Sequence, residues 1–403
     1  MQDNEKKPAL RFKGFTDPWE QRKLGDITVE LSEYATQELG LPLLTSSRSG
    51  LMYQDEYRDS RTTKSTETLF SVVPVGTCTY RHMSDDDVFH MNINTLEKGL
   101  VSREYPVFEA SKGNNLEFLV QHINSSEEFK AFCAEQKKGG TRTRLYYNTL
   151  CQFTVRVPAL KEQAQISQCL KKLDTLITLH QRKYEKLVNI KKSMLDKMFP
   201  KNGASVPEIR FKGFTDPWEQ RKISELAEKT YGGGTPTTSN EAFWNGNIPW
   251  IQSSDIVDGK LMGVEPRKYI TQTGLNSSAT QLVPKNSIAI ITRVGVGKLA
   301  YMPFSYSTSQ DFLSLSKLNT EPFFTVYACY KKLQSELNTV QGTSIKGITK
   351  DELLAKTISV PVYSEQKQIG SFFAQLDTLI TLHQRKLEKL QNIKKSCLEK
   401  MFV

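Results

Sequence analysis

Two long stretches of this 403-residue chain occur twice, in the same order. Residues 11–23 read RFKGFTDPWEQRK, and residues 210–222 repeat all thirteen letters at an offset of 199. Residues 173–199 read LDTLITLHQRKYEKLVNIKKSMLDKMF, and residues 376–402 repeat them nearly unchanged at an offset of 203. Matches this long indicate an internal duplication, so the fold must contain one structural unit twice.

The segments between these matches have diverged. Residues 24–156 and 223–359, termed the two inserts, share only faint echoes such as LPLLTSS (41–47) beside IPWIQSS (248–254). The conserved stretches 11–23 and 210–222 are termed the frame segments. Near-identical frames indicate a shared structural partner, whereas divergent inserts indicate two different ligands.

The end of each repeat has the apolar spacing of a long amphipathic helix. In the first copy the apolar positions are Ile166, Leu170, Leu173, Leu176, Ile177, Tyr184, Leu187, Ile190, Met194 and Met198. In the second copy they are Ile369, Phe373, Leu376, Leu379, Ile380, Leu387, Leu390, Ile393, Cys397 and Met401. Pro158 and Pro361 stand just ahead of these helices, and Ser364 is a candidate N-cap. About 37 helical residues span about 55 Å at 1.5 Å per residue.

So long an apolar stripe must be buried, and the other copy is the expected partner. The sequence therefore predicts an antiparallel helix pair with pseudo-two-fold symmetry, although a simple dimerisation coiled coil is the alternative. His180 and His383 lie within the stripe and are expected to pack or to hydrogen-bond between the helices. The basic residues of HQRK and NIKK are expected on a solvated face, and Gly370 is a candidate for a kink.

The inserts have the character of mixed α/β domains. Short strands are predicted in 67–76, 151–158, 286–295 and 312–318. The polar and basic loops between them combine Arg and Lys, which suit guanine and phosphate, with amides and hydroxyls that suit other base edges. In the first insert the candidates for DNA contact are Thr45, Ser46, Arg48, Arg58, Arg61, Arg81, Lys137, Lys138, Arg142, Arg144 and Tyr146. In the second insert they are Thr235, Thr237, Thr238, Arg293, Lys298, Ser309, Gln310, Ser344 and Lys346.

Composition agrees with a folded protein that binds a polyanion. The net charge is +10 and the pI is near 9.1, a balance that favours nucleic acid, although many basic proteins bind none. The six cysteines show no paired spacing, which excludes a metal or disulfide framework. The sequence contains neither the apolar core of a signal peptide nor a membrane-spanning run, so a cytoplasmic location without membrane contact is expected.

Enzyme signatures are not found. The GVGK at 295–298 has Thr292 where a phosphate-binding loop needs glycine, and Leu299 where it needs Ser or Thr. The DPW of each frame lacks the second proline of the motif with which amino-methyltransferases hold adenine, so Trp19 and Trp218 are expected to pin the frames onto the helices. The Asp351–Glu352 pair only faintly suggests a nuclease. No catalytic, cofactor-binding or metal-binding residue is predicted.

The order of frame, insert and helix, given twice, resembles the specificity subunit of type I restriction–modification systems. The resemblance rests on RFKGF…W before each insert, P-x-x-x-E-Q-x-x-I at each helix start, and L-D-x-L-I followed by K-K…L…M-F along each helix. It covers essentially the whole chain. Residues 232–256, with 309–315 and 343–353, look like a target recognition domain of that family, whereas the first insert is less typical.

The resemblance implies an α+β fold in which two α/β target recognition domains are separated by two long antiparallel helices. The domains are expected at 1–156 and 201–359, and the helices at 157–200 and 360–403. Each domain would read one half of a bipartite, asymmetric site in double-stranded DNA, and the helices would act as a spacer.

The resemblance also implies partners. The helices would bind two methyltransferase subunits, which hold S-adenosylmethionine and methylate adenine. A restriction/translocase subunit driven by ATP and Mg²⁺ would join them to cut unmethylated DNA, so this chain itself would hold no cofactor. The competing hypothesis is a coiled-coil scaffold whose inserts bind proteins. A third, a self-contained nuclease or methyltransferase, is disfavoured because no cofactor motif is present.

Overall fold

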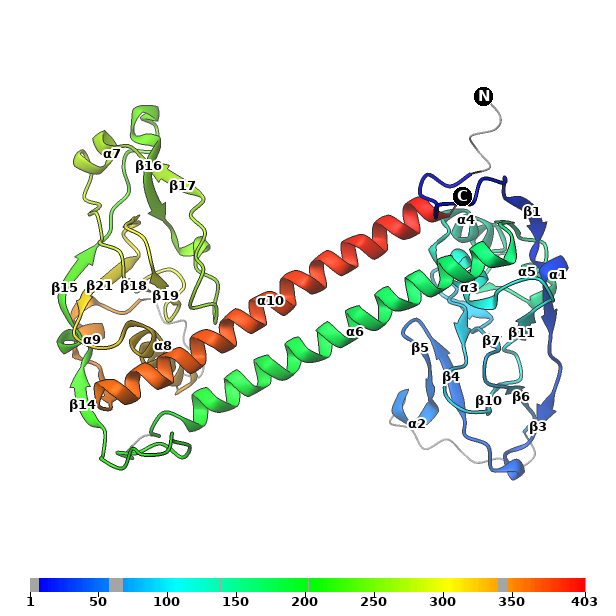
Figure 1. Cartoon of the computed structure of the whole chain (residues 1–403), viewed down its shortest axis with the longest axis horizontal. Helices are drawn as coiled ribbons and strands as arrows, with labels where there is room; N and C mark the ends of the chain where they lie inside the picture. Colours follow the sequence, from blue (N-terminus) through cyan, green and yellow to red (C-terminus); the bar gives the residue numbers. More distant parts are fainter. Residues whose placement is uncertain (1–6, 58–67, 138, 202, 340–346, 403) are drawn as a thin grey trace. The chain divides into compact units, whose positions relative to one another are not determined.

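The computed structural model describes residues 7–57, 68–137, 139–201, 203–339 and 347–402. Figure 1 labels its helices and strands in chain order.

The chain divides into two compact units. Unit 1 comprises Met1–Leu179 with Leu387–Val403, and unit 2 comprises His180–Lys386. The repeat helices α6 (Leu160–Lys197) and α10 (Tyr363–Met401) therefore each contribute one part to both units.

In unit 1 the frame segment forms β1 (Glu20–Lys23), which pairs antiparallel with β13 (Thr154–Val157) at the end of the insert. The larger sheets have the strand orders β10-β6-β3 and β2-β11-β7-β9, beside the ribbons β12-β8 and β4-β5. The other elements of unit 1 are α1 (Leu24–Ile27), β2 (Thr28–Glu30), β3 (Tyr34–Ala35), η2 (Gln37–Leu39), β4 (Leu44–Ser47), β5 (Gly50–Tyr53), α2 (Gln54–Tyr57), β6 (Phe70–Val73), β7 (Cys78–Thr79), β8 (Met83–Ser84), β9 (Asn92–Ile93), β10 (Gly99–Ser102), β11 (Val107–Ala110), α3 (Leu116–Ser125), α4 (Glu127–Glu135), β12 (Thr143–Arg144) and α5 (Tyr147–Leu150).

Unit 2 repeats the frame pairing, with β14 (Glu219–Lys222) against β22 (Thr357–Val360). Its sheets have the orders β15-β21-β18-β19 and β17-β16-β20. Its other elements are η3 (Ile223–Glu225), β15 (Ala227–Gly232), η4 (Glu241–Phe243), β16 (Trp244–Ile251), η5 (Ser253–Asp255), β17 (Lys268–Ile270), α7 (Gln272–Asn276), β18 (Ser287–Ile291), β19 (Leu299–Met302), β20 (Ser307–Thr308), β21 (Phe312–Leu318), α8 (Pro322–Thr339) and α9 (Lys350–Ala355). All four predicted strand segments contain a strand (β6, β13, β18 and β21), and the expected α+β class is confirmed.

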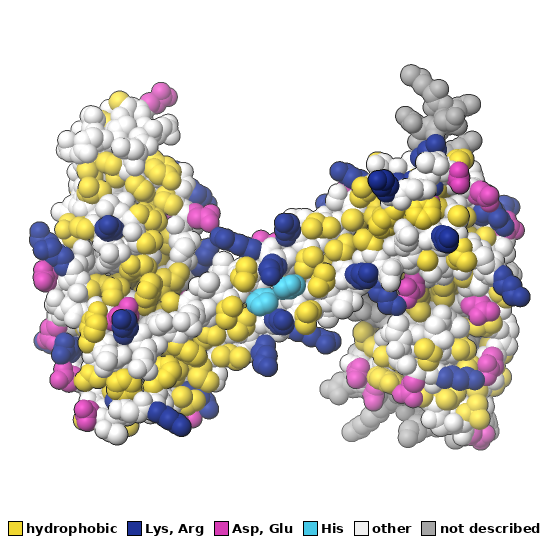
Figure 2. Space-filling model, in the orientation of Figure 1, with side chains coloured by type: hydrophobic (Ala, Val, Ile, Leu, Met, Phe, Trp, Pro, Cys, Tyr) yellow, Lys and Arg dark blue, Asp and Glu magenta, His cyan; other side chains and the backbone are white. Residues whose placement is uncertain are grey.

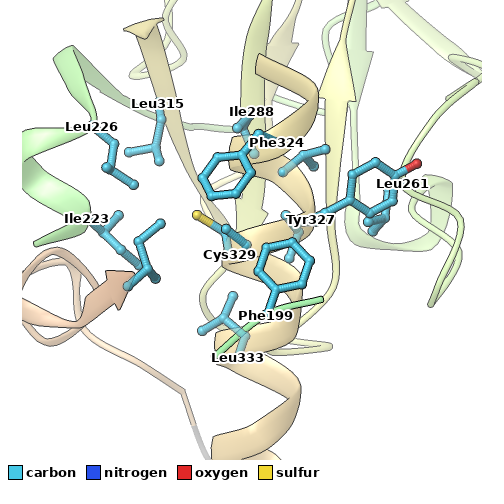
Figure 3. Close-up of a cluster of buried hydrophobic side chains, with 14 of the residues drawn as sticks. Phe199, Ile223, Leu226, Leu261, Ile288, Leu315, Phe324, Tyr327, Cys329 and Leu333 are labelled. Atoms are coloured by element: carbon cyan, nitrogen blue, oxygen red, sulfur yellow. The ribbon is translucent and has the colours of Figure 1, made fainter. Parts of the chain in front are cut away.

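The core of unit 2 lies between its four-stranded sheet, α8 and the frame (Figure 3). Phe324 and Tyr327 of α8 are fully buried there, together with Ile288 of β18 and Leu226 beside the frame. Phe199, which follows α6, stacks on Phe324 with ring centroids 5.8 Å apart. The Met-Phe ending of the repeat is therefore part of the core. In unit 1 the ring centroid of the equivalent Phe402 lies 5.4 Å from that of Phe118.

The two frames make equivalent contacts. Arg11 donates bidentate hydrogen bonds to Glu162 at 2.7 and 2.8 Å, and Arg210 donates to Glu365 at the same two distances. Trp19 and Trp218 are each 3% exposed. They contact Phe118 of α3 and Phe324 of α8 respectively. The tryptophans thus pin each frame mainly onto a helix of its own insert.

The expected antiparallel helix pair is confirmed within each unit. In unit 2, His180 Nδ1 lies 2.8 Å from His383 Nδ1, and Lys191 Nζ lies 2.5 Å from Asp377 Oδ1. In unit 1, Lys394 Nζ lies 2.5 Å from Asp174 Oδ1. The two histidines therefore hydrogen-bond between the helices, as expected. Histidine side chains are coloured cyan in Figure 2.

Two expectations about the helices are wrong. The NIKK lysines do not all face solvent, because Lys191 is only 9% exposed and is paired with Asp377. Ser364 is not the N-cap, because α10 already begins at Tyr363. α10 runs through Gly370 without a break, and a kink at this residue stays a prediction. A Cβ there would lie 2.3 Å from Glu321 Oε2, so glycine allows the start of α8 to approach the helix closely.

Candidate nucleic-acid interface

In unit 1 the structure brings several of the predicted contact residues onto neighbouring loops. The β4–β5 hairpin carries Arg48 at its turn, and Asn92 Nδ2 ties it down through hydrogen bonds to Ser46 Oγ (2.7 Å) and the Ser47 carbonyl (2.8 Å). The ribbon of β8 and β12 pairs Met83 with Arg144. Hairpin and ribbon meet through an ion pair between Arg48 and Asp86.

The cations of this surface are held by carboxylates that directly follow β8. Arg142 Nε lies 2.7 Å from Asp85 Oδ1, and Lys137 Nζ lies 3.6 Å from Asp87 Oδ1. Hydrogen bonds from Ser84 and Arg48 hold the pKa of Asp86 below its ordinary value. This acidic run was not among the predicted site residues, although the letters SDDD at 84–87 were visible in the sequence.

An aromatic stack completes the surface of unit 1. The ring of Tyr146, 49% exposed, stacks on the buried His82 with centroids 5.7 Å apart. Burial lowers the pKa of His82, and the nearby Arg144 and Arg81 lower it further, while Glu104 opposes them. Arg81 and Arg144 are themselves exposed. The exposed phenol ring on a buried imidazole gives this surface an aromatic face, and Arg81 and Arg144 add positive charge close to it.

In unit 2 the glycine-rich loop after β15 lies against the loop between β20 and β21. Thr235 donates to Gln310 Oε1 at 2.6 Å, and the Gly234 amide donates to the Thr308 carbonyl at 2.8 Å. A Cβ on Gly233 would lie only 1.8 Å from the Ser309 carbonyl oxygen. Gly233 is therefore required for the packing of these two loops, which present Thr235 and Gln310 together at the surface.

The β18–β19 hairpin adjoins the same loops. The Thr292 amide donates to the Asp311 carbonyl at 2.7 Å, and the Ile348 amide donates to the Thr292 carbonyl at 2.7 Å. Arg293 follows Thr292 and is exposed, whereas Lys298, which directly precedes β19, is half-buried. The turn between them contains Gly295 and Gly297, both at positive φ near 90°.

The structure does not place all predicted residues alike. Ser46 (5% exposed) and Ser309 (4% exposed) are buried and serve the loops' own hydrogen bonding, whereas Thr45 is half-buried and Thr237 and Thr238 are exposed. Glu352 of the suspected nuclease pair accepts from the Thr349 amide and hydroxyl, so it caps α9. The predicted residues that lie outside the described residues are Arg58, Arg61, Lys138, Ser344 and Lys346.

Neither a metal cluster nor a membrane helix is found in the described ranges. No three His, Cys, Asp or Glu side chains there are grouped as metal ligands would be. Among the described helices, none has the length and apolar character that a membrane crossing requires.

Fold and surface together define a class of protein: a duplicated chain whose two units share one frame and carry different polar loop surfaces. A family model described as the type I restriction modification DNA specificity domain matches residues 90–189 and 215–392. These ranges cover more than half of the chain, which therefore belongs to this family.

Known relatives agree with this assignment. The chain is 26% identical over 193 residues to the type I restriction enzyme MjaIX specificity subunit of Methanocaldococcus jannaschii, a match that covers 46% of this chain and 44% of that protein. It is 30% identical over 169 residues to the EcoR124I/EcoR124II specificity subunit of Escherichia coli, covering 40% and 41%. The matches thus span less than half the length of these two curated relatives. The crystal structure of a type I restriction–modification S subunit from M. genitalium has the same fold, with a TM-score of 0.63, 13% identity and coverage of 98% and 99%.

Proposed function

We propose that this chain is the DNA-reading subunit of a type I restriction–modification complex and catalyses no reaction itself. One observation carries the proposal: equivalent frame contacts, such as Arg11–Glu162 and Arg210–Glu365, hold two different loop surfaces. A frame that is kept while its loops diverge fits one assembly with two different targets. Each insert reads one half of a bipartite DNA site, and the site is asymmetric because the two surfaces differ.

The loop chemistry supports base and phosphate contact. In unit 1, Arg81 and Arg144 are exposed and lie close enough to His82, on which Tyr146 stacks, to lower its pKa. In unit 2, the Thr235–Gln310 pair presents a hydroxyl and an amide near the Arg293 hairpin. Arginine suits guanine and glutamine suits adenine, while further cations fix the register on phosphates.

The helices support binding of two copies of one partner. Leu176 and Leu179 of unit 1 are 41% and 45% exposed, and their repeat equivalents Leu379 and Leu382 of unit 2 are 43% and 45% exposed. Exposed apolar side chains at matching positions on both helices mark equivalent contact surfaces. We assign these surfaces to two methyltransferase subunits.

The chemistry belongs to the partners. The methyltransferase subunits hold S-adenosylmethionine and methylate adenine, and a translocase–nuclease subunit that uses ATP and Mg²⁺ cuts unmethylated DNA in the cytoplasm. This chain recognises the DNA sequence at which the partners act. It needs no cofactor for that task, because base readout uses side chains alone.

Paired half-site mutants test the proposal. Arg293→Ala should weaken binding through one half of the site, and Arg144→Ala should weaken binding through the other half. Fluorescence anisotropy of the partner-bound complex, on duplexes altered in one half at a time, measures both effects. Equal losses of affinity on both duplexes would contradict the proposal that each insert reads one half of the site.

Exchange of residues 24–156 for the insert of a relative gives a second test. Half of the methylated sequence should change and the other half should stay. A partner-bound complex that binds no DNA at all would instead favour a scaffold whose inserts bind proteins.

A further inference from the structure

Three consecutive carboxylates lie among the cations of the unit 1 surface. Asp85 pairs with Arg142 and Asp87 with Lys137 at 2.7 and 3.6 Å, and Asp86 pairs with Arg48. The cations come from two segments, the β4–β5 turn and the stretch before β12. A surface that meets DNA phosphates would be expected to exclude such a run, because carboxylates repel them.

The acidic run is held in place rather than free to swing away. Ser84 Oγ donates to Asp86 Oδ1 at 2.8 Å and accepts from the Val88 amide at 3.1 Å. The hydroxyl of Thr143, in β12, hydrogen-bonds to Asp87. Asp87 has φ of 64°, a left-handed conformation that aspartate tolerates better than most residues. The loop therefore keeps its charges beside the cations.

These ion pairs are too exposed to serve mainly the stability of the fold. The side chains of Arg48 and Asp86 are 65% and 47% exposed, and those of Arg142 and Asp85 are 54% and 71% exposed. Exposed pairs of this kind add little to folding stability and break readily. The carboxylates of these pairs do, however, neutralise arginines that would otherwise be available to bind phosphate.

We propose that Asp85–Asp87 is a specificity device: its carboxylates hold Arg48, Lys137 and Arg142 back from DNA of the wrong sequence. Sequence-independent binding depends on contacts with phosphates. In that mode the carboxylates compete with the phosphates for the three cations and also repel the phosphates directly. In the matching half-site, base amino groups come within reach, and carboxylates accept hydrogen bonds from them. The unfavourable contribution of the carboxylates to the binding free energy is then offset on the correct sequence only. The inference rests on the proposed function.

The test compares two duplexes of about 30 base pairs, a length well above one recognition half-site. One carries the sequence selected by the full-length chain from a random pool, and the other has its first-insert half scrambled. Asp85→Asn/Asp86→Asn should bind the scrambled duplex more tightly. If two cations are freed, the slope of the logarithm of the binding constant against the logarithm of the salt concentration steepens by about 1.8. The binding constant of the variant then falls by an additional factor of about 12 between 50 and 200 mM salt. Affinity for the selected duplex should rise by less, so discrimination falls.

Two controls assign the effect. Glu127→Gln/Glu128→Gln removes the same charge from α4, where Glu127 pairs only locally with Lys130, and should leave discrimination unchanged. In an Arg48→Gln background, Asp86→Asn should strengthen binding to the scrambled duplex less than it does when Arg48 is present, because only the repulsion between Asp86 and the phosphates is then removed.

Unchanged or increased discrimination in Asp85→Asn/Asp86→Asn would overturn the inference while leaving the proposed function intact. An equal effect of the α4 control would also overturn it, since net charge alone would then explain the result. Failure of the wild-type chain to distinguish any sequence would instead refute the proposed function.

Discussion

Removal of the Arg210 guanidinium should leave the buried carboxylate of Glu365, in α10, without its ion-pair partner. Its Nε and Nη2 donate to the Glu365 carboxylate at 2.7 and 2.8 Å, and the Glu365 side chain is 0% exposed. Arg210→Met leaves that carboxylate without its cation. Loss of one partner from a buried pair costs about 3–5 kcal/mol in the free energy of unfolding, because the remaining charge stays desolvated.

The chain offers a matched control. Arg221 pairs with Glu219 at 2.7 Å, but the two side chains are 41% and 70% exposed. Arg221→Met should therefore cost only about 0–1 kcal/mol. Arg210→Met/Glu365→Met should recover most of the loss, because it removes the stranded charge as well.

Urea unfolding followed by tryptophan fluorescence measures these differences. Three of the four tryptophans (Trp218, Trp244 and Trp250) lie in unit 2, so the signal reports mainly on that unit. A loss within about 1 kcal/mol of Arg221→Met would refute the reasoning.

Three further predictions concern the helices and the loops. Burial first, and then His180 and the nearby lysines, lower the pKa of His383, so stability should be intact above the unfolded-state value of about 6.5 and should decline as the pH falls below it. Unfolding midpoints between about pH 7.5 and 5.5 should show that decline in the wild type and less of it in His383→Gln; parallel curves would exclude the histidine as its source. Gly233→Ala should abolish binding to the second half-site in anisotropy titrations, because its Cβ meets the Ser309 carbonyl, whereas Gly232→Ala, with open space around it, should not; equal behaviour of the two would be contrary evidence. Leu176→Ser/Leu379→Ser should weaken methyltransferase binding at both surfaces in calorimetric titrations while circular dichroism stays unchanged, and full stoichiometric binding would count against those surfaces.

The duplicated features of the fold could be predicted from the sequence. A strict apolar period over about 37 residues indicates a long helix, and two such helices with the same stripe are expected to face each other. Part of the stripe does not, because Leu176 and Leu379 are 41% and 43% exposed. The frames could also be recognised, because identical letters occur at 11–23 and 210–222, and the two segments form equivalent strand pairings. These features depend on local periodicity or on repetition, both of which are visible in one sequence.

The pairing of side chains could not be predicted in the same way. Asp86 and Arg48 lie 38 residues apart, and Asp85 and Arg142 lie 57 residues apart, so loop conformation alone brings them together. Lys191 is buried because Asp377 meets it on the facing helix, a contact that helical period does not specify. The hydroxyls of Ser46 and Ser309 suit DNA contact, but both form hydrogen bonds within their own loops, with Asn92 and Asp311 respectively.

Sequencing of methylated adenines tests the central claim most directly. Genomic DNA would be taken from a host that expresses this chain with its methyltransferase partners, and from a matched host that lacks only this chain. The account predicts one bipartite, asymmetric sequence, methylated only when the chain is present, with two unrelated halves separated by a fixed spacer. A palindromic or continuous sequence, or a methylation pattern that is the same without the chain, would contradict it.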